Sequence, residues 1–365
     1  MEREDFLTTQ IITYIGNKRS FLNMLDNVTE TIKRELQQDK LKIGDLFSGS
    51  GIVARNYKKD AELLVTNDME YYSWLLNECY LSDPTQEELE EINKWHQFVV
   101  DNINLDKEDG FFYELYAPKD ITNIREGERC FYTPHNAKYI DSVRQLIEQV
   151  PEHLQKYFIA PLITEASIKT NTSGVFKGFH KNKETGIGQF GGTGKDALSR
   201  IVADIELPKP VFSNYPCAVI NYNNNIFDII DELPDLDLIY LDPPYNQHPY
   251  GSNYFMLNLV ATNQRPENIS KVSGIPTDWN RSVFNVKKES LAAMEDLCRR
   301  LRTKYLAISF SDDGFISKKE MVDMLQQIGE VRVIERNYNT YRGSRNLDDR
   351  DKYVTEIIYV VKKYL

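Results

Sequence analysis

The sequence predicts an α/β protein in which a doubly wound, mostly parallel sheet carries a largely helical insertion. Short apolar runs alternate with helical patterns over residues 1–80, and the alternation resumes over residues 211–365. This is the pattern of parallel strands joined by helices. Residues 81–210 interrupt it and begin with an acidic helical stretch. We therefore expect one core made of 1–80 and 211–365, with 81–210 inserted into it.

The composition is that of a globular protein. The 365 residues are 41% hydrophobic and 27% charged, which is ample material for a core. No apolar run approaches the roughly 20 residues that cross a bilayer, and the charged first residues are unlike a signal peptide. The four cysteines and five histidines have no ligand or disulfide spacing, so we expect no metal, no membrane and a reducing cytoplasm. The net charge of −11 excludes a uniformly basic surface but not a local basic site.

The first predicted helix covers residues 21–36, where apolar residues recur at steps of three and four. Residues 13–19 precede it and contain Tyr14, a glycine and Lys18. A glycine and cations before a helix could hold an anionic group, because the backbone can come close to the ligand. A solvated helix start is the alternative interpretation.

A short strand is predicted over residues 41–45, followed by a turn of small residues and another helix. A turn at the carboxyl end of the first strand is where doubly wound sheets bind nucleotides. The turn lacks both Gly-x-Gly-x-x-Gly and a P-loop, which excludes a nicotinamide oxidoreductase and a phosphate cradle. The candidate ligand contacts of this turn are Asp45, Phe47, Gly49 and Gly51.

Two further strands end in polar residues. The strand predicted over 62–66 leads to Asp68, which is well placed to hold both hydroxyls of a ribose. The alternative role of Asp68 is the N-cap of the helix predicted over 71–80. The strand predicted over 216–220 leads to Asn225 and Ile226, a polar and a large apolar residue that could hold a purine by its edge and face.

The central strand, residues 236–241, runs directly into Asp242, Pro243, Pro244 and Tyr245. The two prolines fix φ and remove two backbone donors, which leaves carbonyls pointing outward beside a carboxylate and an aromatic ring. Asp242 and these carbonyls could accept hydrogen bonds from an exocyclic amino group, while Tyr245 could stack on a base. A plain strand-to-loop turn with a polar cap is the alternative.

The remaining pattern completes the core. We expect a helix over 291–301, strands over 305–309, 331–335 and 353–361, and a helix that begins with a capping box of Ser317 and Glu320.

Cations that could contact a phosphate backbone gather in two segments. Residues 168–200 hold five lysines and one arginine against two carboxylates, with aromatic residues and glycines between them. Such a loop suits a nucleic-acid groove, and a flexible solvated loop is the alternative. The candidates in this segment are Lys177, Lys181 and Lys195. The second segment is residues 337–345, between the last two predicted strands, and its candidates are Arg342 and Arg345.

In this order and spacing the motifs resemble the DNA adenine-N6 methyltransferases that use S-adenosyl-L-methionine. Residues 242–245 are similar to the catalytic motif of that family, and the turn over residues 45–51 is similar to its cofactor loop. Residues 14–18 are similar to its N-terminal cofactor motif, in which an aromatic residue and a lysine contact the cofactor. Tyr14 stands where many relatives have tryptophan.

The resemblance implies a Rossmann-like methyltransferase core and assigns the insertion to target recognition. Asp68 matches the acidic residue that holds the ribose, and Asn225 stands where an aspartate facing the cofactor's adenine is common. The resemblance implies double-stranded DNA as a partner, with a cognate restriction endonuclease as a candidate second partner.

We expect Asp242 and the carbonyl of Pro243 to accept the two hydrogens of an adenine amino group, which localises the nitrogen lone pair. This role is orienting and electrostatic, because the amino group is too weak an acid for a carboxylate to deprotonate it. Tyr245 would stack on the flipped-out adenine. One alternative function is a ribosomal RNA amino-group methyltransferase, and the other is a catalytically silent DNA-binding protein.

Overall fold

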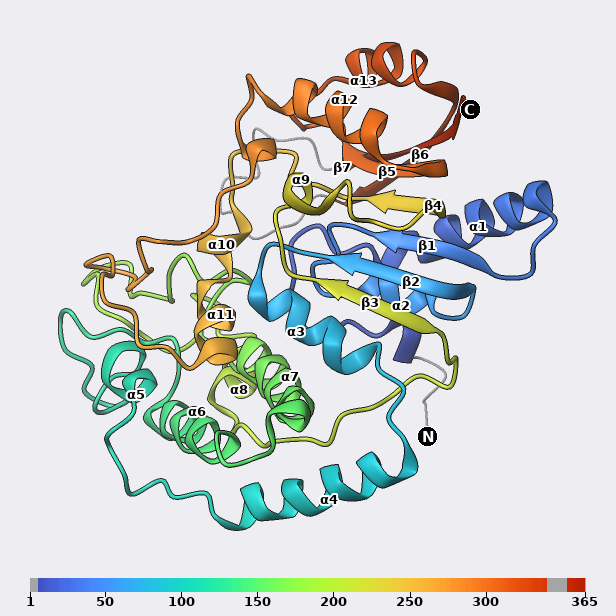
Figure 1. The fold of residues 1–365 in the computed structure, drawn as a ribbon. Helices are drawn as coiled ribbons and strands as arrows, with labels where there is room; N and C mark the ends of the chain where they lie inside the picture. The colour runs from blue at the N-terminus through green and yellow to red at the C-terminus, as the bar shows by residue number, and fades with distance from the viewer. Residues whose placement is uncertain (1–5, 340–352, 365) are drawn as a thin grey trace.

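A seven-stranded sheet forms the centre of the protein (Figure 1). The structure is a computed structural model that describes residues 6–339 and 353–364. The strand order is β3-β2-β1-β4-β5-β7-β6. The first five of these strands are parallel to one another, whereas β7 is antiparallel to both β5 and β6. The strands are β1 (Leu41–Asp45), β2 (Ala61–Asn67), β3 (Ala218–Tyr222), β4 (Leu236–Leu241), β5 (Thr303–Ser311), β6 (Gly329–Asn339) and β7 (Tyr353–Lys363).

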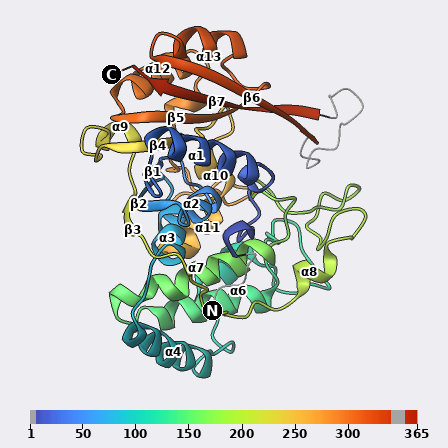
Figure 2. The same cartoon turned by 90° about the vertical axis from the view of Figure 1, so that its right-hand side faces the viewer.

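Helices cover both faces of the sheet, as a doubly wound fold requires. α1 (Leu22–Leu36) and α2 (Ile52–Tyr57) bury their apolar residues against one face. The other face is covered by α9 (Ile226–Ile229), α12 (Ser290–Arg300) and α13 (Lys318–Leu325). The two groups of helices are seen on either side of the sheet in Figure 2. This confirms the predicted fold class.

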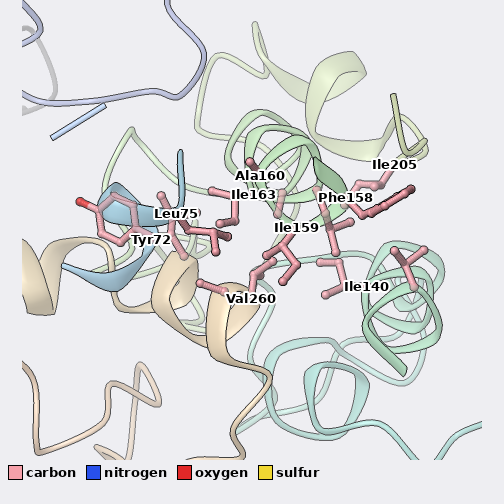
Figure 3. Packing of buried hydrophobic residues seen from close by; sticks show 14 of the residues in the cluster. Tyr72, Leu75, Ile140, Phe158, Ile159, Ala160, Ile163, Ile205 and Val260 are labelled. Atoms are coloured by element: carbon pink, nitrogen blue, oxygen red, sulfur yellow. The ribbon is translucent and has the colours of Figure 1, made fainter. Parts of the chain in front are cut away.

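Most of the remaining helices form a second layer below the sheet in Figure 1. These are α3 (Tyr71–Tyr80), α4 (Gln86–Asp101), α5 (Phe111–Tyr116), α6 (Pro134–Ile147), α7 (Glu152–Ile168), α8 (Leu198–Val202) and α11 (Phe255–Thr262). A single apolar core takes side chains from α3, α4, α5, α6, α7 and α11. In Figure 3, Tyr72 of α3, Ile159 of α7 and Val260 of α11 point into it. Helices from before and after the insertion therefore pack directly on the inserted ones.

The basic segment after α7 is ordered around one buried side chain. Asn171 is fully buried, and its amide nitrogen donates to the carbonyls of Cys130 and Gln189 at 2.8 Å each. Its amide oxygen accepts from the backbone N–H of Gly191 at 3.0 Å. A single antiparallel bridge joins Lys181 to Gly188. The segment is therefore pinned at its base by tertiary hydrogen bonds.

The remaining helical elements of the described residues are short. They are α10 (Tyr250–Asn253) and three 3-10 helices, Phe6–Thr8, Arg19–Phe21 and Val283–Asn285. In the part of the chain that the structure describes, no helix combines the length and apolarity that membrane crossing requires.

Candidate active site

The site lies where β1 and β4 run side by side at the centre of the sheet. The chain moves from β1 outward through β2 to β3, and then returns to β4 and moves outward in the opposite direction. Ligands of open α/β sheets bind at such a switch point, outside the carboxyl ends of the strands. A cavity of about 540 Å³, partly open to solvent, lies here. Its lining comprises Tyr14, Phe47, Asp68, Met69, Glu70, Asp242, Pro244, Tyr250, Asn280, Ser282 and Asn285.

Asp68, which follows β2, is hydrogen-bonded to the turn that follows β1. Its carboxylate accepts the backbone N–H of Gly49 at 2.8 Å and that of Glu70 at 2.9 Å. Burial raises its pKa above the usual value. The N-cap of α3 is Glu70, without a side-chain hydrogen bond. The alternative role of Asp68 as that N-cap is therefore wrong, because the helix starts two residues later than an Asp68 cap would require.

The glycines of the first turn are required by their conformation. Gly49 and Gly51 have φ angles of +51° and +72°, in the left-handed region that disfavours side chains. A Cβ on Gly49 would lie 2.9 Å from the ring of Tyr14. A Cβ on Gly51 would lie 2.4 Å from the side-chain oxygen of Asn77. Gly49 thus lets the turn pass under an aromatic residue of the cavity.

Tyr14 belongs to a stack of three tyrosines. Its ring centroid lies 5.1 Å from that of Tyr250 and 4.8 Å from that of Tyr254, with interplanar angles of 22° in both cases. The hydroxyl of Tyr254 accepts from the backbone N–H of Ile15 at 2.7 Å. The loop after β4 thereby fixes the N-terminal motif beside the cavity.

Lys18 lies behind Asp242 rather than in the cavity lining. Its ammonium is 2.9 Å from Oδ2 of Asp242 and 3.3 Å from Oε1 of Glu356, and it donates to the carbonyl of Gly16 at 2.9 Å. Burial acts to lower the pKa of Lys18, but the charges of Asp242 and Glu356 outweigh it and hold this pKa well above the usual value. One buried cation is thus shared by two carboxylates.

Asp242 keeps 19% of its side chain exposed, on the cavity side of this pair. Burial raises the pKa of Asp242 to about 6; Lys18 opposes this shift, and the charge of Glu356 adds to it. The carboxyl group therefore changes its charge within two units of neutral pH.

Asp45, at the end of β1, is almost fully buried. Neither carboxylate oxygen makes a hydrogen bond of ordinary length and angle within the described residues. Burial and the charges of Asp242 and Asp68 raise its pKa well above the usual value. The end of β1 thus carries an acidic group that a nearby cation would stabilise.

Asn225 and Ile226 lie outside the cavity lining. Asn225 caps α9, since its side-chain oxygen accepts from the N–H of Phe227 at 3.2 Å. Ile226 is 2% exposed and packs in the core. The neighbouring Phe227 stacks on Phe284 with centroids 6.2 Å apart, and Phe284 in turn meets Phe47 edge-on. An aromatic row therefore connects the end of β3 to the cavity.

A second cavity of about 700 Å³ adjoins the first, because Pro244 and Tyr250 line both cavities. Tyr245 and Lys177 also line it, so the aromatic residue of the central motif and a cation of the basic segment meet there. The edge-on contact of Tyr245 with Phe310 fixes its ring. The remaining lining residues are Ile15, Val175, Asn246, His248 and Asn253.

The other predicted cations are more dispersed. Lys181 lies over the ring of Phe179, with its ammonium 5.2 Å from the centroid. Lys195 adopts a φ angle of +53° in a turn. Arg342 and Arg345 lie outside the described residues.

Several site residues have no signal in the sequence pattern. Glu356 lies within a strand, and only the pairing of β7 with β5 brings it to Lys18. Asn280 donates to the carbonyl of Met69 at 3.0 Å, and Asn285 to that of Asn246 at 2.7 Å, which ties this loop across the cavity. Over residues 6–339 and 353–364, no group of three or more metal-ligating side chains is present.

The doubly wound sheet, the cavity at its switch point and the Asp-Pro-Pro-Tyr turn together define an α/β methyltransferase. The sequence matches the model of the D12 class N6 adenine-specific DNA methyltransferase family over residues 14–324, and the chain belongs to this family. It is therefore a DNA methyltransferase specific for the N6 position of adenine, and the ribosomal RNA alternative is not favoured.

Similar proteins match nearly the whole chain. It is 28% identical to the type II methyltransferase M.CviAII of Paramecium bursaria Chlorella virus 1, over 96% of this chain and 98% of that protein. It is 26% identical to the type II methyltransferase M.NlaIII of Neisseria lactamica, over 96% of this chain and 99% of that protein. The type II methyltransferase M.FokI of Planomicrobium okeanokoites is also 26% identical, but the match covers 52% of that longer protein.

Proposed function

We propose that this chain transfers a methyl group from S-adenosyl-L-methionine to N6 of an adenine flipped out of duplex DNA. The observation that carries the proposal is the pair of cavities that share Pro244 and Tyr250 as walls, with Asp242 in the lining of the first and Tyr245 in the lining of the second. The first cavity would hold the methyl donor and the second the target base. Donor and acceptor would then meet at the Asp-Pro-Pro-Tyr turn.

The residues of the first cavity suit this donor. The Asp68 carboxylate would accept hydrogen bonds from the ribose hydroxyls, and Phe47 and Tyr14 offer aromatic faces. Asp45 is buried two residues before the lining residue Phe47 and is not itself part of the lining. Its carboxylate has no hydrogen bond of ordinary geometry within the described residues, so it would favour a cation close to this end of β1, such as the donor's ammonium group. When bound, S-adenosyl-L-methionine supplies an electrophilic methyl group on a sulfonium.

In the proposed mechanism the protein orients the amino nitrogen. Asp242 and the carbonyl of Pro243 accept its two hydrogens, which draws the nitrogen toward a pyramidal geometry and localises its lone pair. Tyr245 stacks on the extruded base, because the target atom cannot be reached inside the duplex. Lys18 holds the carboxylate of Asp242 in place from behind. The rate acceleration then comes mainly from alignment of the reacting atoms.

The target-recognition region would consist mainly of residues 81–210. Lys177 lines the second cavity, and Lys181 and Lys195 follow on the same segment, so this segment would contact the phosphate backbone. The similar proteins described above are type II methyltransferases. On that analogy we propose that a cognate restriction endonuclease shares the recognition sequence of this enzyme.

The test is transfer of labelled methyl from S-adenosyl-L-methionine to unmethylated duplex DNA and, separately, to bulk RNA. We expect label in the DNA alone, recovered after digestion as N6-methyladenine. Label in RNA alone, or label on a base other than adenine, would overturn the proposal. Mapping of the modified adenines in the DNA would give the recognition sequence.

A further inference from the structure

A hairpin lies in the connection between α11 and α12. In residues 268–277, the N–H of Ser270 donates to the carbonyl of Ile275 at 2.8 Å, and the N–H of Thr277 to that of Asn268 at 3.1 Å. A bridge joins Ile269 to Pro276. We call residues 268–277 the tip hairpin. In Figure 1 it belongs to the orange chain at the left, beside green segments of the inserted region.

The tip hairpin is held rigid by the inserted region. The Arg129 guanidinium donates to the carbonyls of Ser270, Lys271 and Val272, at 3.2 to 3.3 Å. It also donates to the carbonyl of Leu115 at 3.1 Å, which anchors it to the inserted region. One side chain thus fixes three successive carbonyls of a surface turn.

Gly274 allows Arg129 and Tyr116 to pack closely against the backbone of the tip hairpin. Its φ angle is +68°, and a Cβ there would lie 2.8 Å from Nε of Arg129 and 2.9 Å from the ring of Tyr116. The Tyr116 hydroxyl donates to the carbonyl of Gly274 at 2.8 Å. The backbone of the turn is therefore packed from below, while its tip projects outward.

The side chains at the tip are exposed. Val272 is 57% exposed, more than any other large apolar side chain in the described residues except Tyr364. Lys271 beside it is also exposed. A rigid turn that presents an apolar and a cationic side chain to solvent loses little entropy when it binds a partner.

The position of the hairpin indicates which partner it meets. The Ser273 hydroxyl donates to the carbonyl of Lys177 at 2.7 Å, and Lys177 lines the cavity proposed for the target base. On the other side the chain continues to Asn280, which lines the donor cavity. Although the chain has a net charge of −11, residues 264–288 hold five cations against two carboxylates. This local charge fits a polyanion.

We infer that the tip hairpin is a second DNA-contacting element, separate from the basic segment of residues 168–200. Lys271 contacts a phosphate, and Val272 inserts as an apolar wedge between bases beside the target adenine. Apolar wedges of this kind stabilise unstacked steps, which accompany the extrusion of a base. The inference rests on the proposed function, because it places the duplex at the mouth of the base cavity.

The experiment measures how tightly variants at exposed residues bind DNA. The probe is a duplex that contains, still unmethylated, an adenine that the wild-type enzyme methylates. Val272→Asp should weaken binding at least tenfold, and Lys271→Ala should weaken it several-fold. Lys271→Ala should also lower the slope of log affinity against log salt by about 0.9, the value for one lost phosphate contact. Val211→Asp, outside the inserted region, and Lys40→Ala before β1 are matched exposed controls that should bind like the wild type.

A fluorescent adenine analogue at the target position reports base extrusion separately. Val272→Ala should reduce its fluorescence gain at saturating protein, whereas Val211→Ala should not. Wild-type affinity, salt slope and fluorescence in the Val272 and Lys271 variants would overturn the inference and leave the proposed function intact. If the wild-type protein failed to methylate any DNA, the proposed function itself would fail, so the two failures are distinct.

Discussion

The ammonium of Lys18 lies 2.9 Å from Oδ2 of Asp242, so a residue from the N-terminal motif pairs with the residue that follows β4. Lys18 is 4% exposed at its side chain, and Glu356 of β7 shares it at 3.3 Å. The contact joins three distant parts of the chain behind the cavity. Because these two carboxylates satisfy Lys18, we propose that it fixes the position of Asp242 and stabilises its charged form.

The ionisation of Asp242 predicts an acid limb in the pH profile of kcat. The carboxylate form accepts hydrogens from the amino group, and protonation removes that capacity. Since burial raises the pKa of Asp242 to about 6, kcat should be full well above pH 6 and should fall as the pH drops through this value. The measurement is kcat between pH 4.5 and 8.5 with both substrates saturating. A kcat that stays constant down to pH 4.5 would contradict this assignment.

Lys18→Gln should move this limb to higher pH. Without the ammonium, the carboxylates of Asp242 and Glu356 lose their shared counter-charge. Loss of an opposite charge at this distance raises a carboxyl pKa by roughly 1–3 units. The variant should therefore lose most activity at pH 7 and regain part of it near pH 9. An unchanged limb would show that Lys18 does not set the charge of Asp242.

Glu356→Gln should move the limb in the opposite direction. The charge of Glu356 adds to the raised pKa of Asp242, so its removal lowers that pKa. We expect the limb to shift toward acid by about one unit or less, with kcat at pH 8 close to wild type. Opposite shifts in the Lys18 and Glu356 variants are the signature of a shared ion pair. Parallel shifts would point to a general loss of structure.

Asp68→Asn should weaken binding of the methyl donor more than it slows the chemistry. The carboxylate of Asp68 accepts two backbone N–H groups, and an amide would set an NH₂ against one of them. A hydrogen bond to a charged group is worth about 1.5–3 kcal/mol, which is roughly 10- to 150-fold in Kd. Calorimetric titration with S-adenosyl-L-methionine measures this, with the exposed Glu62→Gln on β2 as control. Wild-type affinity in Asp68→Asn would remove Asp68 from the donor site.

Gly49→Ala should damage the donor cavity. The left-handed φ of Gly49 and the 2.9 Å approach to the ring of Tyr14 both oppose a Cβ. Strain in this region costs about 1–3 kcal/mol, which should appear as a lower Tm and a higher Kd for the donor. Gly178→Ala is the matched control, because nothing lies within 4 Å of a Cβ there. Equal behaviour of the two variants would show that the turn can adapt.

The parts of the fold with clear periodicity could be predicted from the sequence. The predicted strand over 236–241 coincides with β4, and the predicted helix over 71–80 coincides with α3. The capping box of Ser317 and Glu320 is present at the start of α13. In these places local chemistry and tertiary packing favour the same structure.

α7 shows why other elements could not be predicted. Its residues from Tyr157 to Ile163 are all buried, because α7 packs among the other helices of the lower layer. A helix that is apolar on every side has no polar stripe to mark its period. The place of Glu356 in the site could not be predicted for a different reason. Its contact with Lys18 depends on how β7 pairs with β5, and that register is set by tertiary structure rather than by local sequence.

The central claim is that the carboxylate of Asp242 orients the adenine amino group. The most direct measurement is single-turnover methyl transfer by Asp242→Ala beside Asp237→Ala, with donor binding measured in parallel. Asp237 is a buried aspartate at the other end of β4, where it pairs with Lys304. We predict that Asp242→Ala loses at least 10²-fold in rate while it still binds the donor, and that folded Asp237→Ala turns over like the wild type. Wild-type turnover by Asp242→Ala would contradict the account.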